Sequence, residues 1–408
     1  MLAEQAEPNP RPDLRPRPSP RRLDPQPDHV QARPRKYSSP SSKLSATTTT
    51  QIPATKGDSF GSGGAYVVTV GFGTPLQQTL VFDTGSVVTW VQCQPCAASC
   101  YRQQQPIFDP ARSSTYRNIS CASPYCSPPE LSASTCGASG DTCVYGVQYG
   151  DGSFTQGYYG TDTLALTPAD TIQSFRFGCG QYQGGTFGQV AGLMGLGRAP
   201  SSVVSQADSK YGGVFSYCLP PTSSSAGRLA FGSGSLPSDV QYTPMLSPSS
   251  GGGGGQPFYF LELVSISVGG KKLAISAAVF SNAGTIIDSG TTVTYLPPAA
   301  YSALRRQFRK RMSRYRSAAG EGPLDTCYDF GRASSVTLPA VALEFRGASM
   351  GLAANGIVFP VSSTKACLAF AANGNDSDVG ILGNVQQRTF DVVYDVPNLK
   401  IGFGAQGC

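Results

Sequence analysis

The chain has 408 residues, of which 14% are charged, and it carries 48 Gly, 32 Pro and a single His. Hydrolases of the Ser-His-Asp or Cys-His type need a histidine base inside the fold. The one histidine, His29, lies in a Pro-rich stretch, which argues against both classes. No apolar run reaches the roughly 18 residues that a membrane-spanning helix needs.

Residues 1–57 differ in composition from the rest of the chain. Proline recurs from Pro8 to Pro20, basic residues are common, and apolar residues are too few for a core. We expect 1–57 to be a disordered or polyproline-like tail. It lacks the apolar stretch of a signal peptide, and 30–43 reads as the remnant of a propeptide, which indicates a truncated or alternative start.

The remaining chain favours two mainly β lobes, predicted at 58–245 and 246–408. Each is close to the roughly 150–200 residues of a common domain. Short strands alternate with Gly-containing turns from Tyr66 to about Leu236, whereas helix-period runs are scarce. The Gly run 251–255 predicts a flexible loop near the junction, and 258–268 predicts paired strands.

Two short segments, one in each predicted lobe, share one pattern. Residues 81–86 read Val-Phe-Asp-Thr-Gly-Ser, and residues 286–291 read Ile-Ile-Asp-Ser-Gly-Thr. An Asp that follows an apolar strand and turns on a Gly lies at the end of that strand. Asp83 and Asp288 are therefore predicted to face one another across a cleft. Two close carboxylates share a proton, which supplies one acid and one base at a single site.

A third motif, Tyr149-Gly-Asp-Gly-Ser153, lies between the two Asp segments. The surrounding residues 144–160 are rich in Tyr and Gly and predict a hairpin whose turn is formed by Gly and Asp. By itself this pattern is equally typical of an ordinary surface hairpin.

One segment breaks the β pattern. Residues 297–316 place apolar side chains at helical spacing after a proline. The other face is basic, and we interpret it as a solvated face rather than a nucleic-acid site. Its members are Arg305, Arg306, Arg309, Lys310, Arg311, Arg314 and Arg316.

Taken together, these motifs resemble the pepsin-like aspartic proteases over about residues 63–408. The Cys-rich stretch between the first Asp and the hairpin is similar to that of the plant nepenthesin-type branch, which includes the chloroplast-nucleoid type. The resemblance implies a bilobal double β-barrel with a catalytic cleft between the lobes and a few short helices. It also implies site roles: Asp83 and Asp288 as the catalytic pair, Ser86 and Thr291 as hydroxyls that orient it, Tyr149 as the flap tyrosine and Trp90 as its partner.

Twelve cysteines suggest an oxidising compartment. A four-Cys zinc site or a redox motif at Cys93 and Cys96 is the alternative, and spacing alone does not give connectivity. The resemblance implies these pairs: Cys93–Cys96, Cys100–Cys179, Cys121–Cys143, Cys126–Cys136, Cys218–Cys408 and Cys327–Cys367.

The sequence therefore predicts an endopeptidase that acts at acid pH on protein or peptide substrates, as a monomer without cofactor or metal. A rival reading is a pepsin-fold binding protein that inhibits glycosidases. We expect an extracellular or secretory location, with a plastid as the alternative, and glycosylation candidates at Asn118 and Asn375. Nucleic acid is expected to bind weakly and without sequence preference, if it binds at all.

Overall fold

The computed structural model describes residues 48–126, 135–136, 140–234, 236–246, 257–282, 284–331, 333, 335–405 and 407–408. The chain divides into two units, 1–45 and 46–408, and all described residues belong to the second. The predictions made for residues 1–47 and for the Gly run 251–255 lie outside the described residues. Among the described residues, no helix is both long and apolar enough to cross a membrane.

The largest sheet in the described part of the chain has 15 strands, and it contains both the first strand, β1, and the last strand, β28. Its strands are β1 Thr50–Lys56, β2 Tyr66–Phe72, β3 Leu76–Asp83, β4 Trp90–Gln92, β5 Arg117–Asn118, β6 Thr135–Cys136, β7 Cys143–Gln148, β8 Phe154–Thr167, β9 Asp170–Gly184, β10 Gly192–Gly195, β11 Val214–Cys218, β12 Gly227–Phe231, β13 Gln241–Pro244, β27 Asp391–Asp395 and β28 Lys400–Gly404.

Three smaller sheets are formed by residues 260–382. The first contains β14 Phe260–Leu261, β17 Thr285–Ile287, β26 Gly380–Leu382, β18 Thr294–Leu296 and β25 Phe370–Ala372. The second contains β16 Lys271–Lys272, β15 Leu263–Val268, β21 Val341–Phe345 and β22 Ala348–Gly351, and the third contains β19 Arg316–Ala318, β20 Cys327–Asp329, β24 Lys365–Leu368 and β23 Val358–Pro360.

The described helices are few and mostly short, so the fold is mostly β, as the sequence predicts. They are α1 Val203–Gln206, α2 Asp208–Tyr211, α3 Ala277–Ser281, α4 Pro298–Arg311, α5 Ala354–Ile357 and α6 Asn384–Gln387, with 3-10 turns at Gly57–Phe60, Pro110–Arg112 and Pro124–Cys126.

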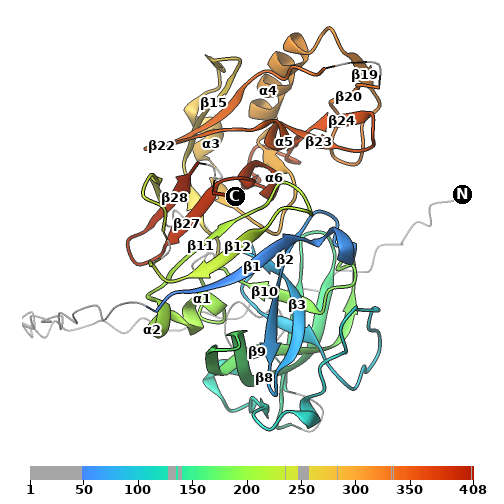
Figure 1. Cartoon of the computed structure of the whole chain (residues 1–408), viewed down its shortest axis with the longest axis vertical. Helices are drawn as coiled ribbons and strands as arrows, with labels where there is room; N and C mark the ends of the chain where they lie inside the picture. Colours follow the sequence, from blue (N-terminus) through green and yellow to red (C-terminus); the bar gives the residue numbers. More distant parts are fainter. Residues whose placement is uncertain are drawn as a thin grey trace, which may run out of the picture. The chain divides into compact units, whose positions relative to one another are not determined.

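The large sheet crosses the predicted boundary between the lobes. Strand β27 pairs with β11, and β28 pairs with β13, so the last strands of the chain complete a sheet built mainly from its first half. Figure 1 shows β27 and β28 beside β11 and β12. The division into 58–245 and 246–408 stays a proposal, and it does not describe how this sheet is assembled.

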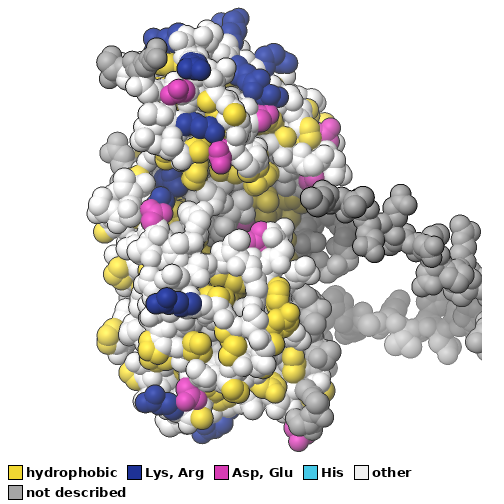
Figure 2. Space-filling model, turned by 90° about the vertical axis from the view of Figure 1, so that its right-hand side faces the viewer, with side chains coloured by type: hydrophobic (Ala, Val, Ile, Leu, Met, Phe, Trp, Pro, Cys, Tyr) yellow, Lys and Arg dark blue, Asp and Glu magenta, His cyan; other side chains and the backbone are white. Residues whose placement is uncertain are grey.

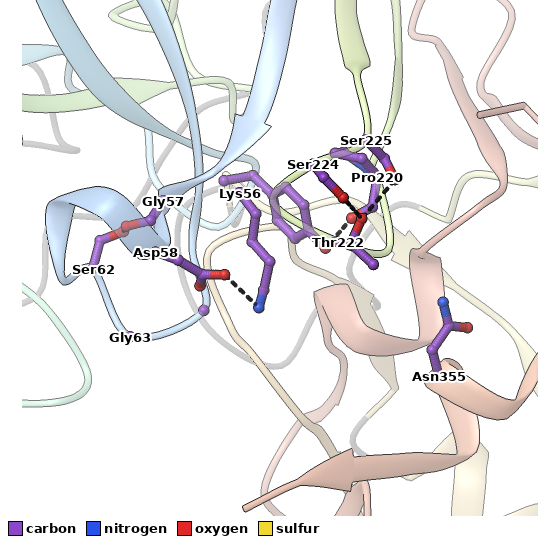
Figure 3. Close-up of polar contacts among 12 residues, drawn as sticks. Lys56, Gly57, Asp58, Ser62, Gly63, Pro220, Thr222, Ser224, Ser225 and Asn355 are labelled. Carbon is purple, nitrogen blue, oxygen red and sulfur yellow. Dashed lines mark hydrogen bonds and ion pairs between the residues drawn. The ribbon is translucent and has the colours of Figure 1, made fainter. Parts of the chain in front are cut away.

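The predicted tail, 1–57, is too long, because its last residues form part of the folded chain. Residues 50–56, placed in the tail from composition, form strand β1, which pairs with both β12 and β2. Ile52 and Ala54 of this strand are buried in the core. Alternation of buried and exposed residues over only seven positions is easily missed beside a long polar segment. At the end of the strand Lys56 pairs with Asp58 at 3.0 Å, and in the turn that follows Ser62 Oγ donates to the Gly57 carbonyl at 2.9 Å (Figure 3).

The predicted helix at 297–316 is confirmed but is shorter. Helix α4 begins at Pro298 and ends at Arg311, and Met312 follows as its cap. Tyr301, Leu304 and Phe308 are buried along one face, as the spacing predicts. The chain then turns and enters β19 at Arg316, because that strand pairs with β20.

All twelve cysteines form disulfides, but four of the six pairs that the resemblance implied are wrong. Cys218–Cys408 and Cys327–Cys367 are confirmed. Cys93 follows β4, which runs parallel to β9, and its amide donates to the Gly180 carbonyl at 2.7 Å. That strand pairing brings Cys93 beside Cys179, and no thiolate remains for the zinc alternative. The corrected pairs are Cys93–Cys179, Cys96–Cys100, Cys121–Cys136 and Cys126–Cys143.

Candidate active site

The two Asp loops occupy equivalent positions in the two halves of the fold. Asp83 is the last residue of β3, and Asp288 directly follows β17. Each strand runs parallel to a Gly-containing strand, β3 to β10 and β17 to β26. Each Asp therefore lies at the end of a buried strand, where a loop begins.

Hydroxyl groups lock the two loops together. The Thr84 amide donates to Ser289 Oγ at 3.1 Å, and the Ser289 amide donates to Thr84 Oγ1 at 3.0 Å. Each hydroxyl then donates across to the other half, Thr84 Oγ1 to the Ile287 carbonyl at 3.3 Å and Ser289 Oγ to the Phe82 carbonyl at 3.1 Å. Both side chains are fully buried, so these reciprocal bonds fix the distance between the loops.

This interlock brings the two carboxyl groups together. The Gly85 amide donates to Asp83 Oδ1, and the Gly290 amide donates to Asp288 Oδ1, each at 2.7 Å. A Cβ atom added to Gly85 would lie 2.6 Å from Asp288 Cγ, and one added to Gly290 would lie 2.3 Å from Asp83 Oδ1. Each carboxylate thus packs over the glycine of the opposite loop, which explains why glycine stands at both positions.

Burial raises the pKa of Asp83 well above its usual range, and the neighbouring Asp288 carboxyl adds to the increase through its charge and a hydrogen bond. Both Asp residues are 8% exposed. A pair of this kind holds one proton between two carboxyl groups over a range of acid pH.

The two predicted orienting hydroxyls differ in geometry. Thr291 Oγ1 donates to Asp288 Oδ2 at 2.6 Å. Ser86 lies close enough to Asp83 to lower the pKa of that carboxyl, but its buried Oγ lacks a well-aligned hydrogen bond. The structure therefore brings both hydroxyls to the pair and bonds only Thr291 firmly.

The predicted hairpin is present, with β7 and β8 paired from Val144–Tyr158 to Gln148–Phe154. Its tyrosine, Tyr149, accepts a hydrogen bond from Trp90 Nε1 at 2.7 Å. Burial raises the pKa of Tyr149 well above 10, so its phenol stays neutral. Phe187 packs edge-on against both rings, at centroid distances of 4.9 Å from Trp90 and 5.8 Å from Tyr149.

The tip of the hairpin is tied to the β9–β10 connection. Asp151 accepts hydrogen bonds from Thr186 Oγ1 at 2.6 Å and from the amide and hydroxyl of Ser153 at 2.9 and 2.8 Å. Although partial burial opposes ionisation, these bonds lower the pKa of Asp151. The carboxylate therefore stays charged at mildly acid pH and holds the tip in place.

Several residues of this site were not singled out in the sequence. The interlocking pair Thr84 and Ser289 was visible as the repeated hydroxyl after each Asp, which is a usable signal. Phe187 and Thr186 belong to a connection with no motif, and only the three-dimensional structure brings them to the hairpin. Among the described residues, no group of three or more His, Cys, Asp or Glu is arranged to hold a metal ion.

The predicted glycosylation candidates lie on the surface. Asn118 ends β5 and is exposed, and its Oδ1 accepts from Tyr116 at 2.8 Å. Asn375 is exposed in a turn, where its Oδ1 accepts from the Ser377 amide at 2.9 Å. Whether either carries a glycan stays a prediction.

The chain matches two family models, Xylanase inhibitor N-terminal over residues 66–233 and Xylanase inhibitor C-terminal over residues 258–405. It is 45% identical to an Arabidopsis thaliana aspartyl protease family protein, over 94% of this chain and 83% of the relative. It is 34% identical to aspartic proteinase nepenthesin-2 of Nepenthes gracilis, over 92% and 84%. Basic 7S globulin from soybean shares its fold, with a TM-score of 0.69 at 21% identity over 88% of this chain and 96% of that one. The chain therefore belongs to the pepsin-like aspartic protease family and is related to its nepenthesin-type members.

Proposed function

We propose that the protein is an endopeptidase that cleaves internal peptide bonds at acid pH. The observation that carries the proposal is the buried pair of carboxyl groups from Asp83 and Asp288, held together by the interlocked hydroxyls of Thr84 and Ser289. Such a pair supplies an acid and a base at one point, which is the requirement for attack by water on an amide.

In the proposed reaction the ionised carboxyl takes a proton from water while the water oxygen attacks the scissile carbonyl carbon. The protonated carboxyl donates its proton to the carbonyl oxygen, which gives a neutral tetrahedral intermediate. When the C–N bond breaks, the protonated carboxyl gives its proton to the leaving nitrogen, and the ionised carboxylate takes a proton from a hydroxyl of the intermediate as the C=O bond re-forms, so the pair is again singly protonated. No acyl-enzyme forms, because water is the nucleophile.

The dyad is tested by Asp83→Asn and Asp288→Asn. Each substitution keeps the side-chain volume and removes a titrating group, so we expect turnover of a denatured protein substrate at pH 3–4 to fall below detection, roughly 10³-fold or more. Unfolding curves of the variants check that the fold remains. Wild-type activity that persists at neutral pH, or either variant with near-wild-type turnover, would refute the proposal.

A second candidate is a binding protein that inhibits a glycosidase such as a xylanase, since both matching family models carry the name xylanase inhibitor. An inhibitor of this kind needs no dyad, so Asp83→Asn would leave inhibition unchanged. Assays of xylanase inhibition and of pepstatin-sensitive proteolysis on the same wild-type sample separate the two functions.

The proposed substrates are proteins or peptides, bound by a monomer. The six disulfides favour an oxidising compartment, extracellular or secretory. Fractionation of plant tissue with an antibody against this chain distinguishes that location from a plastid.

A further inference from the structure

Helix α6 lies behind the second Asp loop and binds its backbone. The Asn384 amide donates to the Thr291 carbonyl at 2.7 Å, and Asn384 Nδ2 donates to the Ser289 carbonyl at 3.1 Å. Gln387 Nε2 donates to the Asp288 carbonyl at 3.0 Å. One turn of helix thus holds the loop that carries the second carboxyl group.

Gln387 holds the Asp288 carbonyl directly and the Asp288 amide through the Leu382 carbonyl. Its Nε2 also donates to the Leu382 carbonyl at 2.8 Å, and that same carbonyl accepts the Asp288 amide at 3.0 Å. The Gln387 side chain is fully buried. Asp288, Leu382 and Gln387 therefore form a closed set of bonds around the position where the carboxyl-bearing residue leaves β17.

The orientation of the Gln387 amide is fixed from its other side. Its Oε1 accepts a hydrogen bond from the Tyr217 hydroxyl, which lies 2.9 Å from the Tyr394 hydroxyl. Rotating the amide would place its oxygen against the carbonyls of Leu382 and Asp288, and the Asp288 carbonyl would lose its Gln387 donor. Strands β11 and β27 of the large sheet thus determine which atom of Gln387 faces the loop.

The first loop is held in a different way. The Asp83 carbonyl accepts from the Leu196 amide at 2.8 Å, a backbone bond that no substitution other than proline removes. The equivalent Asp288 carbonyl depends on a side chain. The two carbonyls are therefore held differently, that of Asp83 by a backbone amide and that of Asp288 by the Gln387 side chain.

We propose that Gln387, oriented by Tyr217, is a positioning residue that sets the distance between the Asp288 and Asp83 carboxyl groups. The inference rests on the proposed acid endopeptidase function, because it assigns a role within that same site. Gln387 is fully buried, and it acts by holding the backbone of Asp288.

Loss of the bond from Gln387 to the Asp288 carbonyl should change the pH dependence of activity, whereas a loss of stability alone should not. Two carboxyls that lie farther apart repel each other less, so their two apparent pKa values move closer together. The bell-shaped dependence of kcat on pH narrows, because the singly protonated pair exists over a smaller range. A displacement of the order of 1 Å lowers kcat by about 10–100-fold, whereas KM changes little.

The experiment compares Gln387→Met with Gln386→Met. Gln386 is the neighbouring residue on α6 and is equally buried, but it bonds to Thr294, Gly356 and Ala369 rather than to the Asp288 loop. Both variants lose buried hydrogen bonds, so both should lower the Tm. We expect only Gln387→Met to narrow the pH profile and to reduce kcat. Equal kinetic effects in the two variants would overturn the inference.

Tyr217→Phe is the second variant, for the case that Gln387→Met does not fold. It removes only the hydroxyl that orients the amide, and we expect a smaller narrowing of the profile. An unchanged pH profile in a folded Tyr217→Phe protein also contradicts the inference.

A readout that does not need turnover separates this inference from the proposed function. Carbon-13 NMR of labelled Asp carboxyls follows the titration of the pair in wild type and Gln387→Met. Inactive wild-type protein would refute the endopeptidase, while the two titration curves would still report the positioning role. Superimposable curves would overturn that role whether or not the protein is active.

Discussion

Asp83 is buried beside a second carboxyl group, and burial and that neighbour together raise its pKa well above the usual range. In an unfolded chain the pKa of the same carboxyl is about 3.9. At pH values between the pKa of the unfolded chain and the higher pKa of Asp83 in the folded protein, the folded protein binds more protons than the unfolded chain. The free energy of unfolding therefore falls as the pH rises through this window, so the stabilising contribution is present at acid pH and is lost toward neutrality.

Asp83→Asn removes this titration while keeping the shape of the side chain. We expect its stabilising effect on the Tm to grow, by up to a few degrees, as the pH rises from 3 toward neutrality, because only wild type must ionise a buried carboxyl. Thermal unfolding at several pH values measures the difference. Asp376→Asn, which changes an exposed carboxylate, is the control and should show no such trend. A pH-independent effect of Asp83→Asn would contradict this account.

At the scale of single residues, the sequence was sufficient to predict that these two carboxyl groups lie together, because the signal is local. The repeated Asp-hydroxyl-Gly motif identified both carboxyls and the glycines on which they pack. It did not identify Gln387, which precedes a buried Arg388 in a segment with no catalytic signature and acts through a backbone carbonyl. A side chain whose role is to bond to a distant main-chain atom leaves no pattern in the sequence.

The hairpin β7–β8 joins the site through Tyr149, which is held by Trp90 and packed against Phe187. Its tip is fastened by Asp151 to Thr186. Gly152 adopts a positive φ of 84° at the turn, which glycine adopts without strain. We propose that the hairpin closes over bound peptide, with Tyr149 as the contact.

Tyr149→Ala should lower kcat/KM about tenfold or more, the scale of a lost positioning contact. Tyr158→Ala provides a matched control, since Tyr158 lies on β8 of the same hairpin but is 38% exposed. Steady-state kinetics on a peptide substrate and a melting curve for each variant are the measurements. Similar kinetics for the two variants would contradict a role of Tyr149 in positioning the substrate.

At the level of elements, the sequence predicted the hairpin and helix α4 but not the disulfide pairs in the Cys-rich stretch. Cys93–Cys179 joins residues 86 apart because β4 and β9 lie side by side. That adjacency is a long-range property of the sheet, and the spacing of Cys93 and Cys96 contains no information about it. Strand β1 was missed for the same reason, since it is stabilised by its partners β12 and β2.

Across the whole molecule, positive charge is concentrated on α4 and the segment that follows it. Figure 2 shows Lys and Arg side chains gathered at the end of the molecule that carries α4 in Figure 1. Several of these cations already have partners. Arg305 pairs with Asp325 at 3.3 Å, Arg311 donates to the Gly269 carbonyl at 3.3 Å, and Arg314 lies over the Tyr315 ring.

We therefore expect DNA to bind this protein only weakly and without sequence preference. Residues 1–45 carry nine Lys or Arg against five Asp or Glu, so the chain without them has a net charge of about +2 instead of +6. Fluorescence anisotropy of a labelled duplex, with the full chain and with 46–408, should show binding at low salt that is lost near about 150 mM. DNA binding that persists at the higher salt concentration would contradict this expectation and support a nucleic-acid-binding function.

The order of strands in the large sheet has a consequence for synthesis. Strand β11 cannot gain its neighbour β27, nor Cys218 its partner Cys408, until residues 391–408 have left the ribosome. These cysteines are 190 residues apart, which corresponds to roughly 10–40 s of translation at common elongation rates. Throughout that interval the nascent first half exposes an unpaired strand edge and a free thiol. The first half is therefore made as an open sheet, and synthesis of β27 and Cys408, rather than completion of the first half, is the event that closes it.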